Sequence, residues 1–250
     1  MPSRCWFDPR TLLGKLFKCE GVDATFTKVA TDAVAATWQG YRSSTGEFLW
    51  YGYGHDAHMF GAIGPLATQC DGDNCQSLRF SITDTWIRYF VARNEKLDLM
   101  TISDEELDDL FIASANEYSS VIGTSDANLS RFRKAGAKLL SWHGLADQLI
   151  PANGTIEYAD RVLEMDPRAQ DYYRLFLAPG ADHNATSEMS PENPLKALVN
   201  WVERGTEPET LRVSGLGAYG DRLERDICVH PRVQHYVGGD PKVPSSFTCL

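Results

Sequence analysis

Two short segments carry side chains that could act together in acid–base chemistry. Asp147 closes the run Trp142-His143-Gly144-Leu145-Ala146-Asp147, and His183 closes the run Ala178-Pro179-Gly180-Ala181-Asp182-His183. A histidine that takes up a proton on one ring nitrogen needs an acceptor at the other, and a carboxylate serves that purpose. Asp147 and His183 are therefore a candidate catalytic pair. From spacing alone, the alternative is that both are ordinary loop residues that shape turns.

The segments around this pair predict a strand, a helix and a second strand. Residues 136–142 and 171–178 are short, mostly apolar runs typical of buried parallel strands, and residues 156–164 have the apolar spacing of an amphipathic helix. Such a βαβ unit joins two parallel strands. Because Asp147 and His183 each follow the carboxyl end of a strand, we expect neighbouring strand ends to bring them together.

The longer stretches that contain these residues are similar to a known family. Residues 139–150 (LLSWHGLADQLI), 173–183 (YRLFLAPGADH) and 193–211 (NPLKALVNWVERGTEPETL) closely resemble the tannase and feruloyl esterase family. The segments at 5–13, 46–52 and 86–90 resemble the lid of that family, and those at 227–231 and 247–250 resemble its tail. The resemblance therefore covers nearly the whole chain.

The resemblance implies an α/β protein, a partial α/β-hydrolase with a small parallel βαβ unit. It implies a lid-like region over residues 1–135, the portion carrying the aspartate and histidine over residues 136–205, and an irregular, disulfide-clipped tail over residues 206–250. It also implies hydrolysis of aromatic carboxylic esters such as galloyl or feruloyl esters, with Asp147 as triad acid and His183 as triad base. The candidate substrate-binding residues are Trp50, Tyr51, Trp142 and His143. No cofactor is expected.

The nucleophile of such a triad is not evident. The chain contains no G-x-S-x-G pattern. In the family the serine lies on an elbow before the lid, so this chain is expected to begin after that point. Four serines near turns or near the pair are expected to be structural: Ser43, Ser44, Ser141 and Ser187. Asn184 stands where the family commonly has a cysteine bridged to one beside the serine.

Three functions stay open. The chain is the C-terminal part of an ester hydrolase whose serine comes from another segment or partner chain. Alternatively, Asp147 and His183 perform acid–base chemistry on a small molecule, as in an isomerase, cyclase or lyase of secondary metabolism. A third reading is a ligand-binding pseudoenzyme.

The cysteines predict disulfide bonds. The resemblance pairs Cys228 with Cys249, and Cys70 and Cys75 are close enough in sequence to clip a short loop. That acidic loop has too few oxygen ligands for calcium, which takes roughly six to eight, and His55 and His58 lack a further ligand nearby, so no metal is expected. Cys5 must pair with Cys19 or stay free.

Composition limits the partners and leaves the location open. The net charge of −10 and isoelectric point near 5.1 argue against nucleic acid and acidic membrane surfaces as partners. No run of about twenty apolar residues predicts a membrane span. Six cysteines and the family resemblance suggest secretion, whereas the first residues do not resemble a signal peptide.

The sequence also predicts three helices and a strand that has one unpaired edge. We predict helices at 27–39, capped by Thr27, at 103–118, opened by a capping box, and at 194–203. The last should cover the small sheet with Leu195, Leu198, Val199 and Val202. The strand at 136–142 would keep a free edge, which predicts a serine-bearing partner, a homo-oligomer, a rearranged fold or aggregation.

Overall fold

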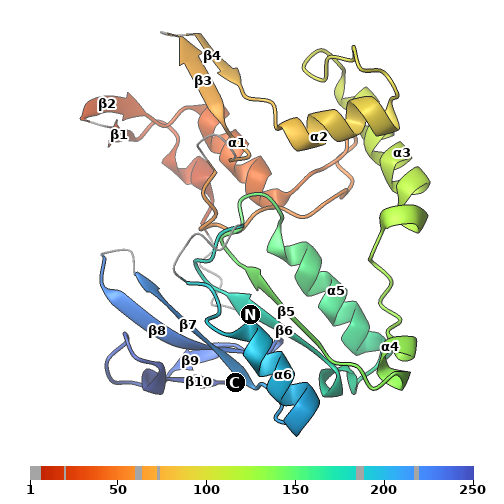
Figure 1. Ribbon diagram of the computed structural model, residues 1–250. Coiled ribbons are helices and arrows are strands. Elements are labelled where there is room, and N and C mark those ends of the chain that lie inside the picture. Colours follow the sequence, from red (N-terminus) through yellow and green to blue (C-terminus); the bar gives the residue numbers. More distant parts are fainter. Residues whose placement is uncertain (1–6, 20, 60–63, 72–73, 184–188, 217–219) are drawn as a thin grey trace. The chain divides into compact units, whose positions relative to one another are not determined.

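The computed structural model describes every residue except 1–6, 20, 60–63, 72–73, 184–188 and 217–219 (Figure 1). The chain forms two compact units. Unit 1 consists mainly of Tyr53–His58 and Ala127–Leu250, and unit 2 of Asp8–Gly52 and Met59–Asp126. Residues 53–58, which fall in the region expected to be lid-like, thus belong to unit 1.

Unit 2 is built from helices and two small antiparallel hairpins. Its elements are a 3-10 turn at Pro9–Leu12, β1 (Leu16–Cys19), β2 (Val22–Thr25), α1 (Lys28–Gln39), β3 (Thr68–Asp71), β4 (Asn74–Ser77), α2 (Ser81–Trp86) with a π-helical turn at Ile87–Val91, and α3 (Asp104–Ile122). Strand β1 pairs with β2, and β3 with β4.

Both predicted helix starts in unit 2 are confirmed. The hydroxyl of Thr27 accepts the backbone N–H of Ala30 at 3.2 Å and caps α1. At α3, Ser103 Oγ accepts the Glu106 N–H at 3.2 Å, while the Glu106 carboxylate accepts the Ser103 N–H at 2.8 Å. These reciprocal bonds satisfy N–H groups that a helix leaves without an internal partner.

Unit 1 is centred on two parallel strands. Its elements are α4 (Ser130–Lys134), β5 (Leu139–Gly144), α5 (Ala152–Met165), a 3-10 turn at Ala169–Asp171, β6 (Tyr173–Ala178), α6 (Pro194–Arg204), β7 (Thr210–Leu216), β8 (Arg222–Cys228), β9 (Gln234–Tyr236), a 3-10 turn at Pro244–Ser246 and β10 (Phe247–Cys249). Strands β5 and β6 run parallel from the pair Leu139 and Tyr173 to the pair Gly144 and Ala178. The predicted βαβ unit is confirmed, with its helix beginning earlier, at Ala152.

Strand β6 is buried on both faces. Tyr173 and Leu175 pack in a core cluster with Ala159 and Val162 of α5. Phe176, on the opposite face, packs with apolar residues of β7 and β8. Side chains alternate across a strand, so both layers are needed to cover it. Strand β5 is only half-buried before Gly144, and among the described residues β6 is its sole partner strand.

Helix α6 presents a different side from the one predicted. The buried residue is Trp201, which is 1% exposed, whereas Leu195 and Val202 are 72% and 60% exposed. Two cations lie near the indole ring, with Lys138 Nζ at 5.0 Å and Arg174 Cζ at 5.2 Å from its centre. Burying the indole ring of Trp201 next to these cations stabilises the packed helix more than burying its exposed aliphatic residues would. The prediction that Leu195, Val199 and Val202 cover the sheet is wrong.

The chain after Gly205 is more regular than predicted. Strands β7 and β8 pair antiparallel over seven residues each. Leu211 and Val213 of β7 alternate inward and are buried, as is Ile227 of β8. The prediction of an irregular tail over 206–250 is therefore wrong for the β7–β8 hairpin. Apolar residues alternate along its strands with the two-residue period of a β-strand, so one face of the hairpin contributes to the core.

Two disulfide bonds close loops as predicted. Cys228 and Cys249 are joined at 1.99 Å, and Cys70 and Cys75 are joined across the β3–β4 hairpin at 2.08 Å. Cys19 is exposed and carries a free thiol. Cys5 lies outside the described residues.

Candidate active site

The loops after β5 and β6 are joined by backbone hydrogen bonds. The N–H of Leu145 donates to the carbonyl of Ala178 at 2.9 Å, and the N–H of Ala146 donates to the carbonyl of Ala181 at 3.1 Å. Gly144 permits this approach, because a Cβ at that position would lie 2.2 Å from the carbonyl oxygen of Ala181. The two strand ends therefore hold their loops in direct contact.

This contact brings Asp147 and His183 together. His183 Nδ1 lies 3.1 Å from Oδ2 and 3.2 Å from Oδ1 of Asp147. The carboxylate is buried, with 7% of the side chain exposed, whereas the imidazole is 29% exposed. Since a carboxylate can only accept, Nδ1 of His183 is the donor. The carboxylate thus fixes the ring and leaves Nε2 available for proton transfer.

Backbone groups hold the carboxylate in place. Asp147 Oδ1 accepts the N–H groups of Leu149 and Ile150, each at 2.8 Å. The neighbouring Gln148 accepts the backbone N–H of His183 through Oε1 at 3.2 Å. The loop after β5 therefore positions both members of the pair, one through its own turn and the other through a side-chain amide.

A second histidine, His143, lies beside the same carboxylate. Its Nε2 is 3.3 Å from Oδ2 of Asp147 and 3.1 Å from the carbonyl oxygen of Ile150. Its Nδ1 is 2.7 Å from the hydroxyl of Thr155 on α5. His143 is predicted from the sequence to bind substrate; in the structure its ring lies next to the carboxylate of Asp147.

The segment Tyr53–His58 also approaches this loop. A Cβ on Gly54 would lie 2.2 Å from the carbonyl oxygen of Leu145, so the two backbones pass closely there. Burial raises the pKa of Tyr53, and the negative charge of Asp147 raises it further. Tyr53 is thus a neutral phenol near the pair, a neighbour that no local sequence pattern predicts.

The remaining predicted substrate-binding residues are distributed over both units. Trp142 packs against the core cluster around Phe176 in unit 1. Trp50 and Tyr51 are in unit 2, where their rings meet edge to face at 5.6 Å. Their roles in binding remain predictions.

The serines near turns have structural contacts. Ser43 accepts the N–H of Glu47 at 2.9 Å, the N–H of Ser44 donates to Asp108 at 2.7 Å, and Ser141, within β5, bonds the Tyr173 hydroxyl at 3.3 Å. Ser187 and Asn184 lie outside the described residues. No serine described here occupies an elbow between a strand and a helix at the pair.

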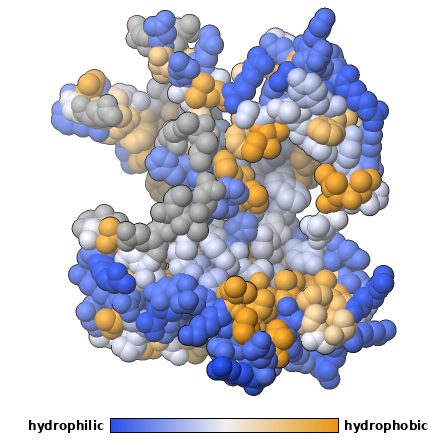
Figure 2. Space-filling view, viewed as in Figure 1, coloured by the Kyte–Doolittle hydropathy of each residue, from blue (hydrophilic) through white to orange (hydrophobic). Residues whose placement is uncertain are grey.

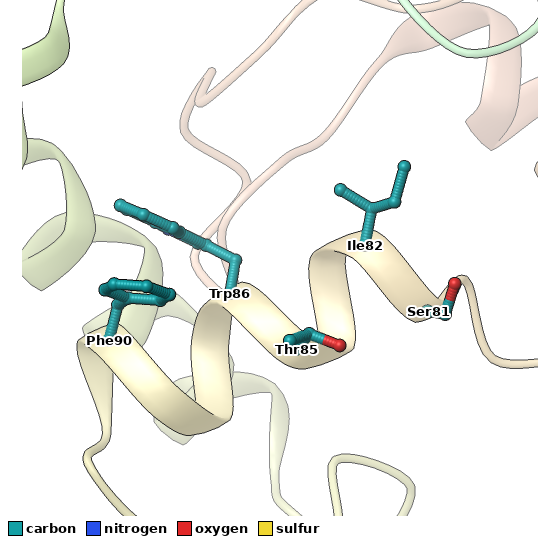
Figure 3. A pocket seen from close by; sticks show the side chains of 5 residues that line it. All are labelled: Ser81, Ile82, Thr85, Trp86 and Phe90. Carbon is teal, nitrogen blue, oxygen red and sulfur yellow. The ribbon is translucent and has the colours of Figure 1, made fainter.

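An aromatic depression lies on unit 2. Figure 3 shows Ile82, Trp86 and Phe90 along one side of α2 and the π-helical turn, with Ser81 and Thr85 completing the lining. The cavity volume is about 360 Å³, and the rings of Trp86 and Phe90 stack at 5.0 Å. Its surface is mainly apolar, which suits a flat apolar group.

The described part of the chain offers neither a metal cluster nor a membrane span. Within it, no three His, Cys, Asp or Glu side chains are grouped to hold a metal ion. None of its helices combines the length and apolarity needed to cross a bilayer.

Comparison with known proteins adds an independent observation. A family model described as "Tannase and feruloyl esterase" matches residues 1–250. A "Probable feruloyl esterase" of Arthroderma benhamiae is 35% identical over 98% of this chain and 47% of its own length. The fold is similar to that of tannin acyl hydrolase from Aspergillus niger, with a TM-score of 0.80 and 24% identity over 98% of this chain and 47% of the other.

Feruloyl esterase B from Aspergillus oryzae is similar to the same extent, with a TM-score of 0.79 and 22% identity over 98% of this chain and 50% of the other. The chain therefore spans about half the length of the relatives it matches.

Proposed function

Because this chain belongs to the tannase and feruloyl esterase family, we propose that Asp147 and His183 are the acid and base of a carboxylic ester hydrolase. The observation that carries the proposal is the contact of 3.1 Å between a buried carboxylate and His183 Nδ1. In this arrangement Nε2 of His183 takes the proton of an attacking hydroxyl and later gives it to the leaving alcohol. Asp147 stabilises the imidazolium that forms in between.

The proposed nucleophile is a serine outside these 250 residues. The sequence has no G-x-S-x-G pattern, and Ser43 and Ser141 make the structural contacts given above. We propose that a serine-bearing segment, in the same longer chain or in a partner, supplies it. A general base without a nucleophile cannot form an acyl-enzyme, so the chain alone should not complete this reaction.

Two surfaces of unit 1 support such a segment as partner. The outer edge of β5 has no paired strand among the described residues, and parallel strands are normally covered on both sides. Figure 2 shows hydrophobic side chains gathered over α6, where Leu195, Val199 and Val202 are exposed. Exposed apolar groups of this kind favour contact with another protein surface. We propose that the serine-bearing segment adds a strand to β5.

The proposed substrate is an aromatic or phenolic ester. Unit 2 falls within the region expected to form a lid. It contains aromatic rings at Trp50, Tyr51, Trp86 and Phe90. Aromatic side chains bind flat rings through stacking and edge contacts. Two relatives, one named a probable feruloyl esterase and the other a tannin acyl hydrolase, support this substrate class.

A chimera tests the proposal. The half of the Arthroderma benhamiae relative that this chain does not match is fused before residue 1, and hydrolysis of methyl ferulate and methyl gallate is measured. Hydrolysis is expected in the chimera, and His183→Ala should reduce kcat by at least about 1,000-fold. The matched control is His230→Ala, since His230 also bonds a carboxylate, that of Asp160, at 2.7 Å.

The control should keep activity within a few-fold of the unsubstituted chimera. If a folded chimera hydrolyses neither ester, or if His183→Ala leaves turnover unchanged, the proposal is wrong. Activity of the 250-residue chain alone toward a small molecule, lost on His183→Ala, would instead favour acid–base chemistry without an acyl-enzyme.

A further inference from the structure

The side chain of His143 is held at three points. It stands on β5, and only 13% of it is exposed. One ring nitrogen contacts Thr155 of α5, and the other lies between the carbonyl of Ile150 and the carboxylate of Asp147. A strand, a helix and the loop between them thus converge on one imidazole.

These contacts determine which ring nitrogen of His143 carries the hydrogen. Both groups near Nε2 can only accept a hydrogen bond, so Nε2 carries a proton. A hydroxyl can donate as well as accept, so Thr155 can donate to Nδ1 of a neutral ring. His143 is then protonated at Nε2, whereas His183 is protonated at Nδ1 because that nitrogen faces Asp147. The two histidines on one carboxylate carry opposite tautomers.

We propose that His143 is a positioning residue for Asp147. The N–H groups of Leu149 and Ile150 bind only Oδ1, so the position of the carboxylate depends on how the loop that carries these N–H groups is held. The Nε2–H of His143 donates to the carbonyl of Ile150 at 3.1 Å and thereby holds that loop, and Nε2 lies 3.3 Å from Oδ2 of the carboxylate. The carboxylate then presents its remaining lone pairs to His183. This inference rests on the proposed roles of Asp147 and His183 and adds a residue that does not touch substrate.

The same contacts explain why a buried polar ring stands at this place. Thr155 ties the ring to α5, and the carbonyl of Ile150 ties it to the end of the loop that carries Asp147. A displacement of the loop would lengthen the contacts at Nε2. His143 therefore couples the position of the loop to the orientation of the carboxylate.

A spectroscopic measurement on the 250-residue chain tests the geometry without turnover. Long-range ¹H–¹⁵N correlation spectra distinguish the two imidazole tautomers. His143 is expected as the Nε2–H form and His183 as the Nδ1–H form. An Nδ1–H form of His143 that leaves Nε2 without a proton would overturn the inference, because Nε2 could then not donate to the carbonyl of Ile150.

Variants of His143 separate positioning from bulk packing. His143→Gln places an amide N–H near the position of Nε2, whereas His143→Leu fills the space without a donor. The Leu variant should speed exchange of the His183 Nδ1–H with water at least about tenfold, and the Gln variant should stay within a few-fold of the original. His230→Leu is the matched control, since that side chain is also 13% exposed and bonds a different carboxylate.

The active chimera provides the kinetic test. His143→Leu should lower kcat about 10- to 100-fold with little change in KM, and His143→Gln should restore most of it. Equal losses in folded Leu and Gln variants, or no loss in the Leu variant, would overturn the inference. A chimera without any turnover would count against the proposed function alone, since the spectra of the isolated chain do not depend on it.

Discussion

Replacing Gly144 by alanine tests whether close contact of the two loops is required for Asp147 to meet His183. The added Cβ would stand 2.2 Å from the carbonyl oxygen and 2.7 Å from the carbonyl carbon of Ala181, whereas ordinary contact begins near 3.4 Å. The backbones must therefore separate by roughly 1 Å. A comparable shift of His183, two positions further along the chain, would lengthen its 3.1 Å contact with Asp147 beyond hydrogen-bonding reach.

The expected cost is about 1–3 kcal/mol of unfolding free energy, the usual range for overpacking against groups that cannot move freely. Urea denaturation measures this cost, and the ring N–H signal of His183 reports whether the pair survives. Gly136→Ala is the matched control. Its Cβ would meet nothing within 4 Å, but its φ of +70° makes alanine unfavourable by about 1 kcal/mol.

The control should lose stability while keeping the ring signal, and Gly144→Ala should lose both. If Gly144→Ala unfolds at the same urea concentration as the original chain and keeps the His183 signal, the reasoning about loop contact is refuted.

Three further predictions address charge, capping and covalent closure. Asp147→Asn should lower the pKa of Tyr53 only part of the way to that of free tyrosine, because burial is the larger cause of its rise; ultraviolet titration against Tyr53→Phe measures this. Since the unfolded chain loses the Tyr53 proton first, stability should also fall as pH rises above about 10, and Tyr53→Phe should reduce that fall. Ser103→Ala removes the capping box and should cost about 1 kcal/mol in urea unfolding, whereas Ser103→Asp should not. Replacing Cys228 and Cys249 by serine opens a loop with a sequence separation of 21 and should cost about 3 kcal/mol, more than opening the short β3–β4 loop; equal losses would contradict the chain-entropy account.

Much of the site could be predicted from local sequence. The apolar runs before Asp147 and His183 specify two strands, and the intervening amphipathic pattern specifies the crossover helix. Since parallel strands end at the same edge, the meeting of the two side chains follows from that topology. The caps at Thr27 and Ser103 were also predictable, because a cap involves only residues within one turn of the helix.

Other features depend on partners that are distant in sequence. The apolar residues of α6 suggested which side would be buried, but the buried side chain is Trp201, which contacts Lys138 and Arg174. The inward alternation of Leu211 and Val213 is visible in the sequence, yet only its partner strand shows that the segment belongs to the core. Periodicity tells that a face is apolar; it does not tell which face finds a partner.

The sequence by itself determined the family, the parallel strands and the candidate pair of Asp147 and His183, because each is encoded in short patterns of residue type and spacing. Only the tertiary structure decided that His143 lies beside the carboxylate of Asp147 and that Tyr53 lies near that charge. The physical reason is that a hydrogen bond depends on atomic positions within a few tenths of an ångström. Those positions are fixed where strand, helix and loop pack together, and no single segment contains them.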